Sequence, residues 1–289
     1  MPKFYREPKR IYRFIVCDLD GTVLTHDYRL SPRVREAMQA VVEAGVWITI
    51  SSGRGYQMLK PVLHSLPLNA PVIGCNGGLI FDPATRQILY LQPMPLSLAQ
   101  YIVRLALQEQ WGMRIYLDDM ETMLEFHPEQ QPALVLMRDG IVVGEITDAV
   151  TALQRPPHKL VVYSQSPDAT PALVARLQEY VGDRAHVVAS NTQIVEIITP
   201  GISKATGMSW VASYLGVKRE EAIAIGDGDN DVEMLEWAGL GIAMGNATPA
   251  AKAAADWIAP PVEEDGVAAA LQQFVLRPAL ARVTDSERI

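Results

Sequence analysis

The chain has 289 residues, of which 49% are apolar, and it carries a formal net charge of −8. This length and composition allow a large buried core in one or two domains. The negative charge argues against nonspecific binding to nucleic acid or to anionic lipid. No uninterrupted apolar run approaches the roughly 18 residues of a membrane span, and the beginning of the sequence lacks the apolar stretch of a secretory signal. We expect a soluble protein with no nucleic-acid or membrane partner.

The two cysteines, Cys17 and Cys75, lie inside or beside apolar runs that have the pattern of strands. We therefore expect both cysteines to be buried thiols, as in proteins of a reducing compartment. We expect the protein to be cytoplasmic.

The first 80 or so residues alternate between strand and helix patterns. Ser31 and Pro32 are suited to the N-cap and first position of a helix. Continuous apolar strands that alternate with amphipathic helices predict a parallel sheet covered on both faces. The expected strands are 11–17, 46–50 and 72–75, and the expected helices are 31–45 and one that follows Gly53-Arg54.

The pattern changes near Asp82-Pro83 and returns to its first form after about residue 199. Between these points we expect strands with two-residue periodicity, such as 88–91 and 114–117, and helices near 96–111 and 170–181. The returning pattern predicts helices at 203–215, 229–237 and 247–255 and strands at 222–225, 240–243 and 257–258. The simplest interpretation is an α/β core, residues 1–82 and 199–289, that is interrupted by an α+β domain at 83–198.

Two aspartates, Asp18 and Asp20, directly follow the apolar run 14–17. Carboxylates at i and i+2 at the end of a strand point to the same side. Acidic pairs in such a place destabilise the fold, because they repel each other and must be desolvated. A bound cation would offset this cost. The alternative is a plain Asp-Gly turn that ends the strand at Gly21.

A second acidic cluster, Gly226–Asp231, follows the apolar strand 222–225 and opens a helix. A turn followed by a helix cap accounts for one aspartate, but three aspartates within five residues are more than a cap needs. An EF-hand calcium loop is excluded because Val232 stands where that loop needs glycine and Ala238 where it needs glutamate. The P-loop pattern is absent.

Two smaller clusters lie at the starts of helices. Ser52, Gly53 and Arg54 follow the second strand, where a hydroxyl and free amides can face a ligand, although a serine N-cap would look the same. Lys204 begins a later helix, where a cation gains nothing from the helix dipole. A solvated surface lysine is the alternative reading of Lys204.

All four clusters fall at the carboxyl ends of core strands or at the starts of core helices, which is the edge where open α/β sheets bind ligands. Carboxylates offer hard oxygen ligands to Mg²⁺, and the hydroxyl, lysine and amides offer donors to a phosphoryl group. The sequence therefore predicts a site for Mg²⁺ and phosphate at this edge.

In these motifs the sequence resembles the haloacid dehalogenase superfamily phosphatases, of the Cof-type branch with a large cap inserted late in the core. The resemblance covers essentially the whole chain and implies a Rossmann-like α/β fold. The motifs occur in the family's order, and the sequence departs from common family usage at Ser52, where many members have threonine, and at Ala205, where glycine is frequent. The matching segments are Asp18–Thr22, Ser52–Arg54, Lys204 and Gly226–Asp231, with Asn76–Gly78, Gly241–Ala247 and Glu264–Ala268 typical of the branch.

The resemblance implies a role for each motif residue. Asp18 would be the nucleophile that forms an aspartyl-phosphate, and Asp20 would be the general acid and base. Mg²⁺ would be held by Asp18, the backbone carbonyl of Asp20, and Asp227, with Asp231 supporting it from outside the ligand shell or through water. The residues implied to bind the phosphoryl group are Ser52, Gly53, Arg54, Lys204 and Asn230.

The expected activity is Mg²⁺-dependent hydrolysis of a small phosphorylated metabolite, such as a sugar phosphate or a cofactor phosphate. The alternatives are a phosphomutase and a non-catalytic sensor of phosphorylated metabolites. A monomer or a small homo-oligomer is expected. The inserted domain offers polar candidates for substrate choice, none of which we assign: Arg114, Asp118, Asp119, His127 and Asn191.

Overall fold

The computed structural model describes residues 11–117, 119–120, 122–127, 131–138, 141–146, 153–189 and 192–277. Asp118 and Asn191, two of the polar candidates, lie outside these ranges. The chain divides into two compact units, of which the first comprises residues 1–52, 62–89 and 203–289 and the second 53–61 and 90–202. The domain limits expected from the sequence, at 82/83 and 198/199, stay a prediction.

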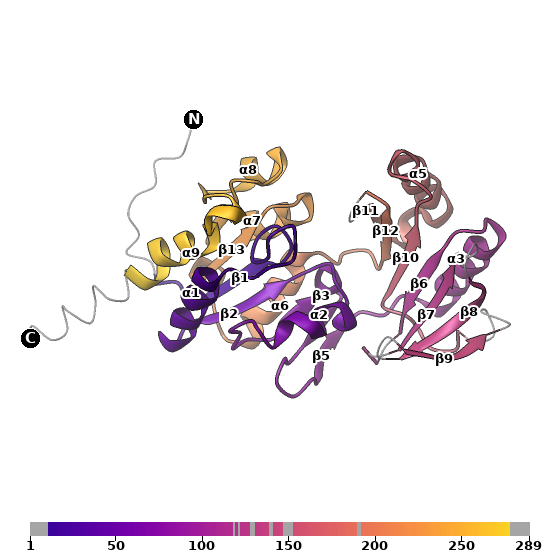
Figure 1. Ribbon diagram of the computed structural model, residues 1–289, viewed down its shortest axis with the longest axis horizontal. Helices are drawn as coiled ribbons and strands as arrows, with labels where there is room; N and C mark the ends of the chain where they lie inside the picture. The colour runs from indigo at the N-terminus through magenta and orange to yellow at the C-terminus, as the bar shows by residue number, and fades with distance from the viewer. Residues whose placement is uncertain are drawn as a thin grey trace, which may run out of the picture. The chain divides into compact units, whose positions relative to one another are not determined.

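The first unit is built on one eight-stranded sheet, with the order β15-β14-β13-β1-β2-β3-β4-β5. β1 pairs in parallel with β2 on one side and with β13 on the other, so segments far apart in the sequence lie side by side (Figure 1). The expected parallel sheet is confirmed, with β4 as an antiparallel addition to β3. The strands are β1 (Phe14–Asp18), β2 (Trp47–Ser51), β3 (Val72–Gly74), β4 (Leu79–Phe81), β5 (Ile88–Leu91), β13 (Ala222–Gly226), β14 (Leu240–Ala243) and β15 (Trp257–Ile258).

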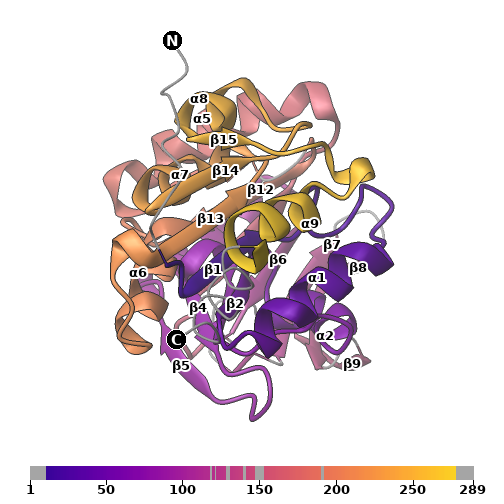
Figure 2. The ribbon, with the colours of Figure 1, turned by 90° about the vertical axis from the view of Figure 1, so that its left-hand side faces the viewer.

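Helices cover both faces of this sheet. Because crossovers between parallel strands are right-handed, the β1-to-β2 connection and the β13-to-β14 connection, which run in opposite directions along the sheet, place their helices on opposite faces. α1 packs beside α9, and α6 packs beside α7, which contacts α8 (Figure 2). Every residue of β1 is buried, as expected of a strand covered on both sides. The helices are α1 (Pro32–Glu43), α6 (Lys204–Tyr214), α7 (Val232–Trp237), α8 (Pro249–Ala254) and α9 (Gly266–Leu271), while α2 (Tyr56–Leu63) begins in the second unit and ends in the first.

β5 differs from the sequence expectation. The change of pattern near Asp82-Pro83 places strand 88–91 in the inserted domain, whereas β5 joins the sheet of the first unit, and the limit between the two units at 89/90 falls within it. The strand is half-buried along its whole length. The physical reason for the misreading is that a half-buried strand at a sheet edge has the same mixed pattern as a strand of an α+β domain.

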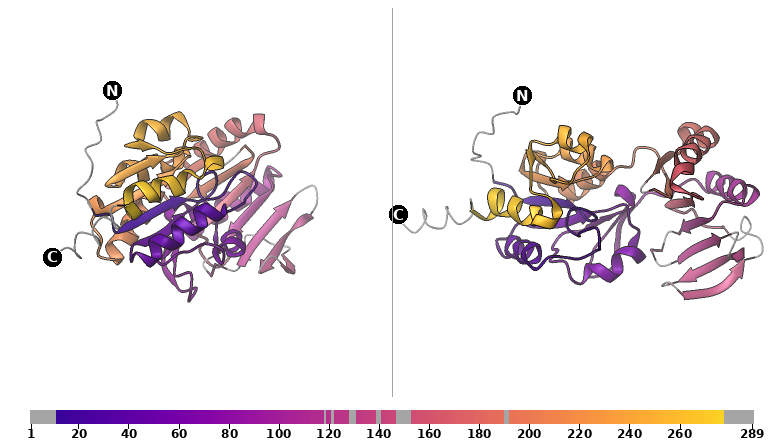
Figure 3. Two further views of the ribbon diagram at one scale, coloured as in Figure 1. Left: turned by 60° about the vertical axis from the view of Figure 1, so that its left-hand side comes forward. Right: turned by 45° about the horizontal axis from the view of Figure 1, so that its top comes forward.

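The second unit is a seven-stranded sheet with the order β11-β12-β10-β6-β7-β8-β9. Its strand pairs are antiparallel, and α3 (Leu96–Gln108) and α5 (Thr170–Val181) cover one face (Figure 3). Ile102 and Leu177 from the two helices pack with Leu160 in one apolar core. The strands are β6 (Met113–Tyr116), β7 (Thr122–His127), β8 (Gln131–Arg138), β9 (Ile141–Ile146), β10 (Lys159–Tyr163), β11 (His186–Ala189) and β12 (Ile194–Ile198).

The opposite face of this sheet carries paired charges. The Lys159 ammonium lies 2.5 Å from Glu196 Oε1, and both side chains are buried. The same ammonium donates a hydrogen bond of 2.7 Å to the carbonyl of Gly53, and residues 53–61 group with this unit. Arg114 pairs with Glu125 at 2.5 Å. In the part of the chain that the structure describes, no helix combines the length and the apolar character needed to cross a membrane.

Candidate active site

The predicted carboxylates meet at the carboxyl edge of the first unit's sheet. Asp18 is the last residue of β1, and Asp227 directly follows β13. β1 and β13 are parallel neighbours in the register Cys17↔Ile225, so both strands end at the same level. Asp231 ends the short 3₁₀ turn η5 (Asp229–Asp231) that precedes α7.

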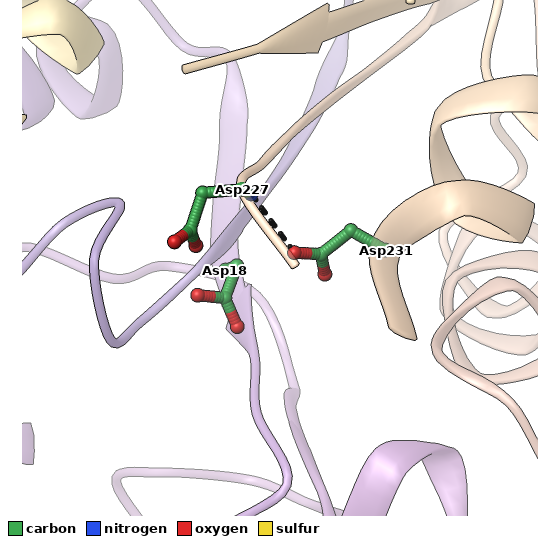
Figure 4. A group of neighbouring side chains, drawn as sticks. All are labelled: Asp18, Asp227 and Asp231. Carbon is green, nitrogen blue, oxygen red and sulfur yellow. Dashed lines mark hydrogen bonds between the residues drawn. The ribbon is translucent and has the colours of Figure 1, made fainter. Parts of the chain in front are cut away.

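These three side chains form a compact acidic cluster. One carboxylate oxygen from each of Asp18, Asp227 and Asp231 lies within 4.8 Å of the others (Figure 4). Asp18 and Asp231 are buried and Asp227 is half-buried. Carboxylate oxygens converging at this separation have the chemistry and the spacing of a site for a hard divalent cation.

Lys204 brings a positive charge into the cluster from the start of α6. Its ammonium donates to Asp18 Oδ1 and, at 2.6 Å, to Asp231 Oδ1, and the side chain is 1% exposed. The helix start is fixed by a capping box, in which Ser203 Oγ accepts from the Thr206 N–H and Thr206 Oγ1 accepts from the Ser203 N–H. The alternative reading of a solvated surface lysine is wrong.

Electrostatics keep Lys204 charged. Burial opposes the ammonium form, but the carboxylates of Asp18 and Asp231 outweigh burial and raise the pKa of Lys204 above its ordinary value. The lysine therefore remains a cation at any physiological pH.

Asp231 shapes the loop that follows β13. Its Oδ2 accepts the backbone N–H groups of Asp227 and Gly228, each at 2.9 Å, while its Oδ1 accepts the Lys204 ammonium. A Cβ at Gly226 would lie 2.5 Å from the carboxyl carbon of Asp231, so only glycine allows this close approach. Both oxygens of Asp231 are thus already engaged.

Asp227 is held by two side chains to which sequence reasoning gave no role. Thr22 Oγ1 donates to Asp227 Oδ1 at 2.9 Å, and Asn246 Nδ2 lies 3.4 Å from Asp227 Oδ2. Asn246 also donates to the carbonyl of Gly21 at 2.8 Å. Thr22 and Asn246 both stand within segments that match the family, which was the signal available in the sequence.

The cluster has more negative than positive charge. Burial raises the pKa of Asp18 well above a carboxyl group's usual range, and Lys204 opposes this rise whereas Asp231 and Asp227 add to it. Burial likewise raises the pKa of Asp227, against the hydrogen bond from Thr22. A cation bound between these oxygens would favour the ionised carboxylates, so the residues present fit a metal ion.

Asp20 stands apart from the acidic cluster. Its side chain is exposed, and its backbone is held in a tight loop by a bridge to Leu24 and by a 2.8 Å hydrogen bond from the Gly21 N–H to the Leu24 carbonyl. An exposed carboxyl group two residues beyond a buried one can exchange protons with solvent or with a leaving group.

Gly21 is the residue on which this loop depends, because its φ is +85° and a Cβ would lie 2.4 Å from Asp227 Oδ2. We expect Gly21→Ala to lower kcat/KM by about 100-fold, since displacing a site carboxylate by about 1 Å has that effect. Gly45→Ala is the matched control: its φ is +73°, with nothing within 4 Å of the added carbon. Each variant should lose about 1–2 kcal/mol of stability from the left-handed backbone, measured by urea unfolding. Equal activity of the two variants would contradict the prediction.

The predicted phosphate-binding residues fall into two groups. Ser52 is buried beside the site, next to Ser51, which pairs with Asp18 in the sheet. Asn230 is exposed on η5 and donates to Asn76 Oδ1 at 3.0 Å. Gly53 and Arg54 follow Ser52 directly in the chain, belong to the second unit, and are half-buried.

Comparisons with known proteins agree with this geometry. The family model of haloacid dehalogenase-like hydrolases matches residues 15–271. The 5-amino-6-(5-phospho-D-ribitylamino)uracil phosphatase YitU of Bacillus subtilis is 30% identical over 90% of this chain and 96% of that protein. An HMP-PP phosphatase of Serratia proteamaculans is 27% identical over 84% of this chain and 87% of that protein. A solved haloacid dehalogenase-like hydrolase from Bacteroides thetaiotaomicron superposes with a TM-score of 0.79 at 27% identity, covering 91% of this chain and 99% of that one.

The chain therefore belongs to the haloacid dehalogenase-like hydrolases, since the family model spans most of its length. Within that family it is a phosphoric monoester hydrolase of the Cof type, as its phosphatase relatives match nearly end to end. The resemblance stated from the sequence motifs, and the Rossmann-like fold that it implied, are confirmed.

Proposed function

We propose that the protein is a Mg²⁺-dependent phosphatase that hydrolyses a small phosphomonoester, a sugar phosphate or a cofactor phosphate, through an aspartyl-phosphate on Asp18. The observation that carries the proposal is the buried contact of Asp18 with Lys204 beside Asp227 and Asp231. A nucleophilic carboxylate and an ammonium in contact form a place where a phosphoryl group can be attacked and its charge offset.

The metal would be held by the carboxylates of Asp18 and Asp227 and by the backbone carbonyl of Asp20. Asp231 would support it from outside the ligand shell, because both of its oxygens already accept hydrogen bonds. Bound Mg²⁺ would offset the negative charge shared by the nucleophile and the phosphoryl group.

The residues then divide the reaction into two displacements. An Asp18 oxygen forms a bond to phosphorus, the ester P–O bond breaks, and the departing alcohol takes its proton from Asp20. Water next gives a proton to Asp20 and attacks phosphorus, so that the bond to Asp18 breaks and inorganic phosphate leaves. Throughout, Ser52, Lys204 and Asn230, together with Gly53 and Arg54, would bind the phosphoryl oxygens.

For the substrate we propose only a chemical class, and for the assembly only a range of states. A small phosphorylated metabolite is supported by the names of the relatives, one a phosphatase of a phosphoribitylamino-uracil and another of HMP-PP. A monomer or small homo-oligomer in the cytoplasm is our working proposal. The buried free thiols of Cys17 and Cys75 support a reducing compartment.

The metal is tested by a measurement that does not require activity. We expect Mg²⁺ at a hundred times its dissociation constant to stabilise the wild-type protein by about 2.7 kcal/mol, seen as a higher melting temperature. Asp227→Asn should abolish this stabilisation, because it removes a ligand charge. Asp229→Asn is the matched control, since Asp229 is exposed and accepts from Thr248 Oγ1 at 2.6 Å. A full Mg²⁺ effect in Asp227→Asn would overturn this metal site.

The reaction itself is tested by product analysis over a panel of phosphorylated metabolites with Mg²⁺ present. Release of inorganic phosphate supports the phosphatase. An isomerised sugar phosphate without release would support the phosphomutase alternative, and tight binding without either product would support a sensor.

A further inference from the structure

The loop that follows β3 has an unusual backbone. Cys75, Asn76 and Gly77, which form the 3₁₀ turn η1 (Cys75–Gly77), have φ values of +51°, +53° and +102°. Two successive non-glycine residues in the left-handed region are energetically costly and persist only where the surroundings fix them. Both Cys75 and Asn76 are buried, so the constraint comes from packing inside the first unit.

Asn76 connects two segments of the site. Its backbone N–H donates to the Ser52 carbonyl at 3.0 Å, and its side-chain Oδ1 accepts from Asn230 Nδ2 at 3.0 Å. Ser52 follows β2 and Asn230 lies 154 residues beyond Asn76, after β13. A single buried residue thus bridges the two loops that would bind the phosphoryl group.

The same loop is locked against the beginning of α6. A Cβ at Gly77 would lie 2.2 Å from the Ser203 carbonyl oxygen, and a Cβ at Gly207 would lie 3.0 Å from Gly77 Cα. Because an added carbon at either glycine would overlap neighbouring atoms, there is no space for a side chain between η1 and the first two turns of α6, which carry Lys204. The loop is therefore fixed relative to three elements of the site: the segments of Ser52 and Asn230, and the start of α6.

We propose that Asn76 is a positioning residue for phosphoryl binding, which acts by fixing Asn230 and the Ser52 loop around Lys204. This inference rests on the proposed function, because the phosphoryl-binding roles of Ser52 and Asn230 are part of that proposal. Asparagine suits the position because it tolerates the left-handed backbone and offers an uncharged acceptor on a short side chain.

The test compares Asn76→Gly, Asn230→Ala and the double variant. Glycine keeps the left-handed backbone without strain, so Asn76→Gly removes the side chain alone. We expect Asn76→Gly to raise both KM for an aryl phosphate and the inhibition constant of inorganic phosphate by roughly fivefold, the size of one lost hydrogen bond, with a smaller change in kcat. Because Asn76 acts through Asn230, the double variant should be no worse than Asn230→Ala.

Arg86→Gly is the matched control, since Arg86 is exposed, has a φ of +61° and lies in the turn between β4 and β5. It should leave KM and the inhibition constant unchanged. If the wild type is active, two results would overturn this inference and leave the proposed function standing. One is an unchanged KM and an unchanged inhibition constant in Asn76→Gly. The other is a double variant in which the effects of the two substitutions add. A wild type that hydrolyses no phosphomonoester would overturn both.

Discussion

Replacing Asp18 by asparagine is expected to lower kcat for an aryl phosphate by about 10⁴-fold or more, the scale seen when a nucleophile is removed from a catalytic unit. The amide has the shape of the carboxylate but cannot form the acyl phosphate. The measurement is release of inorganic phosphate with Mg²⁺ present. The matched control is Asp229→Asn, which changes an exposed aspartate near the same loop and should keep wild-type activity.

The Asp18→Asn protein should stay folded, so that lost activity cannot be attributed to unfolding. The substitution removes one of three clustered carboxylates, which relieves repulsion, and Lys204 keeps its contact with Asp231. Melting followed by circular dichroism should therefore show a single cooperative transition near that of the wild type. Rapid quenching with labelled substrate should trap phosphate on the wild-type protein only. Hydrolysis by Asp18→Asn at the wild-type rate would contradict the mechanism.

Lys204→Met should lose both activity and stability. Methionine has a similar length, but it leaves the carboxylates of Asp18 and Asp231 buried without their cation. Breaking a buried ion pair in this way costs about 3–5 kcal/mol, which urea unfolding would measure. Lys252→Met, in the last turn of α8, is the control and should change stability by less than about 0.5 kcal/mol.

The stability deficit of Lys204→Met should depend on cations and pH. Without the ammonium, the pKa of Asp18 rises further, so the folded state takes up protons more readily than the unfolded chain as the pH falls. The deficit should therefore shrink at acid pH. Added Mg²⁺ should recover more stability in this variant than in the wild type. A stability deficit that changes with neither pH nor Mg²⁺ would show that lost packing, not unpaired charge, is its cause.

The parts of the fold that depend on local signals could be predicted from the sequence. The Ser31-Pro32 cap placed α1 correctly, with Ser31 Oγ accepting from the Val34 N–H at 3.3 Å. The apolar run before Asp18 correctly predicted β1, although Asp18 itself is the last residue of the strand. The helix expected at 229–237 begins with a 3₁₀ turn, and its α-helical part starts at Val232.

What could not be predicted depends on contacts between distant segments. The hydrogen bond from Thr22 to Asp227 joins residues 205 positions apart. The burial of Lys204 follows from its two carboxylate partners, and a single sequence carries no measure of burial for an isolated lysine. The bridge made by Asn76 depends on a left-handed backbone that packing imposes, since asparagine alone does not require it.

The pairing of β1 with β13 has a consequence for the growing polypeptide. β1 emerges from the ribosome roughly 200 residues before its partner, which at 5–20 residues per second is about 10–40 s. During that interval one edge of a strand that is fully buried in the native fold has no native neighbour, and such an edge is a template for pairing with other chains. A chain that stalls or is cut before Ala222 would keep that edge exposed, so truncated products of this gene should aggregate.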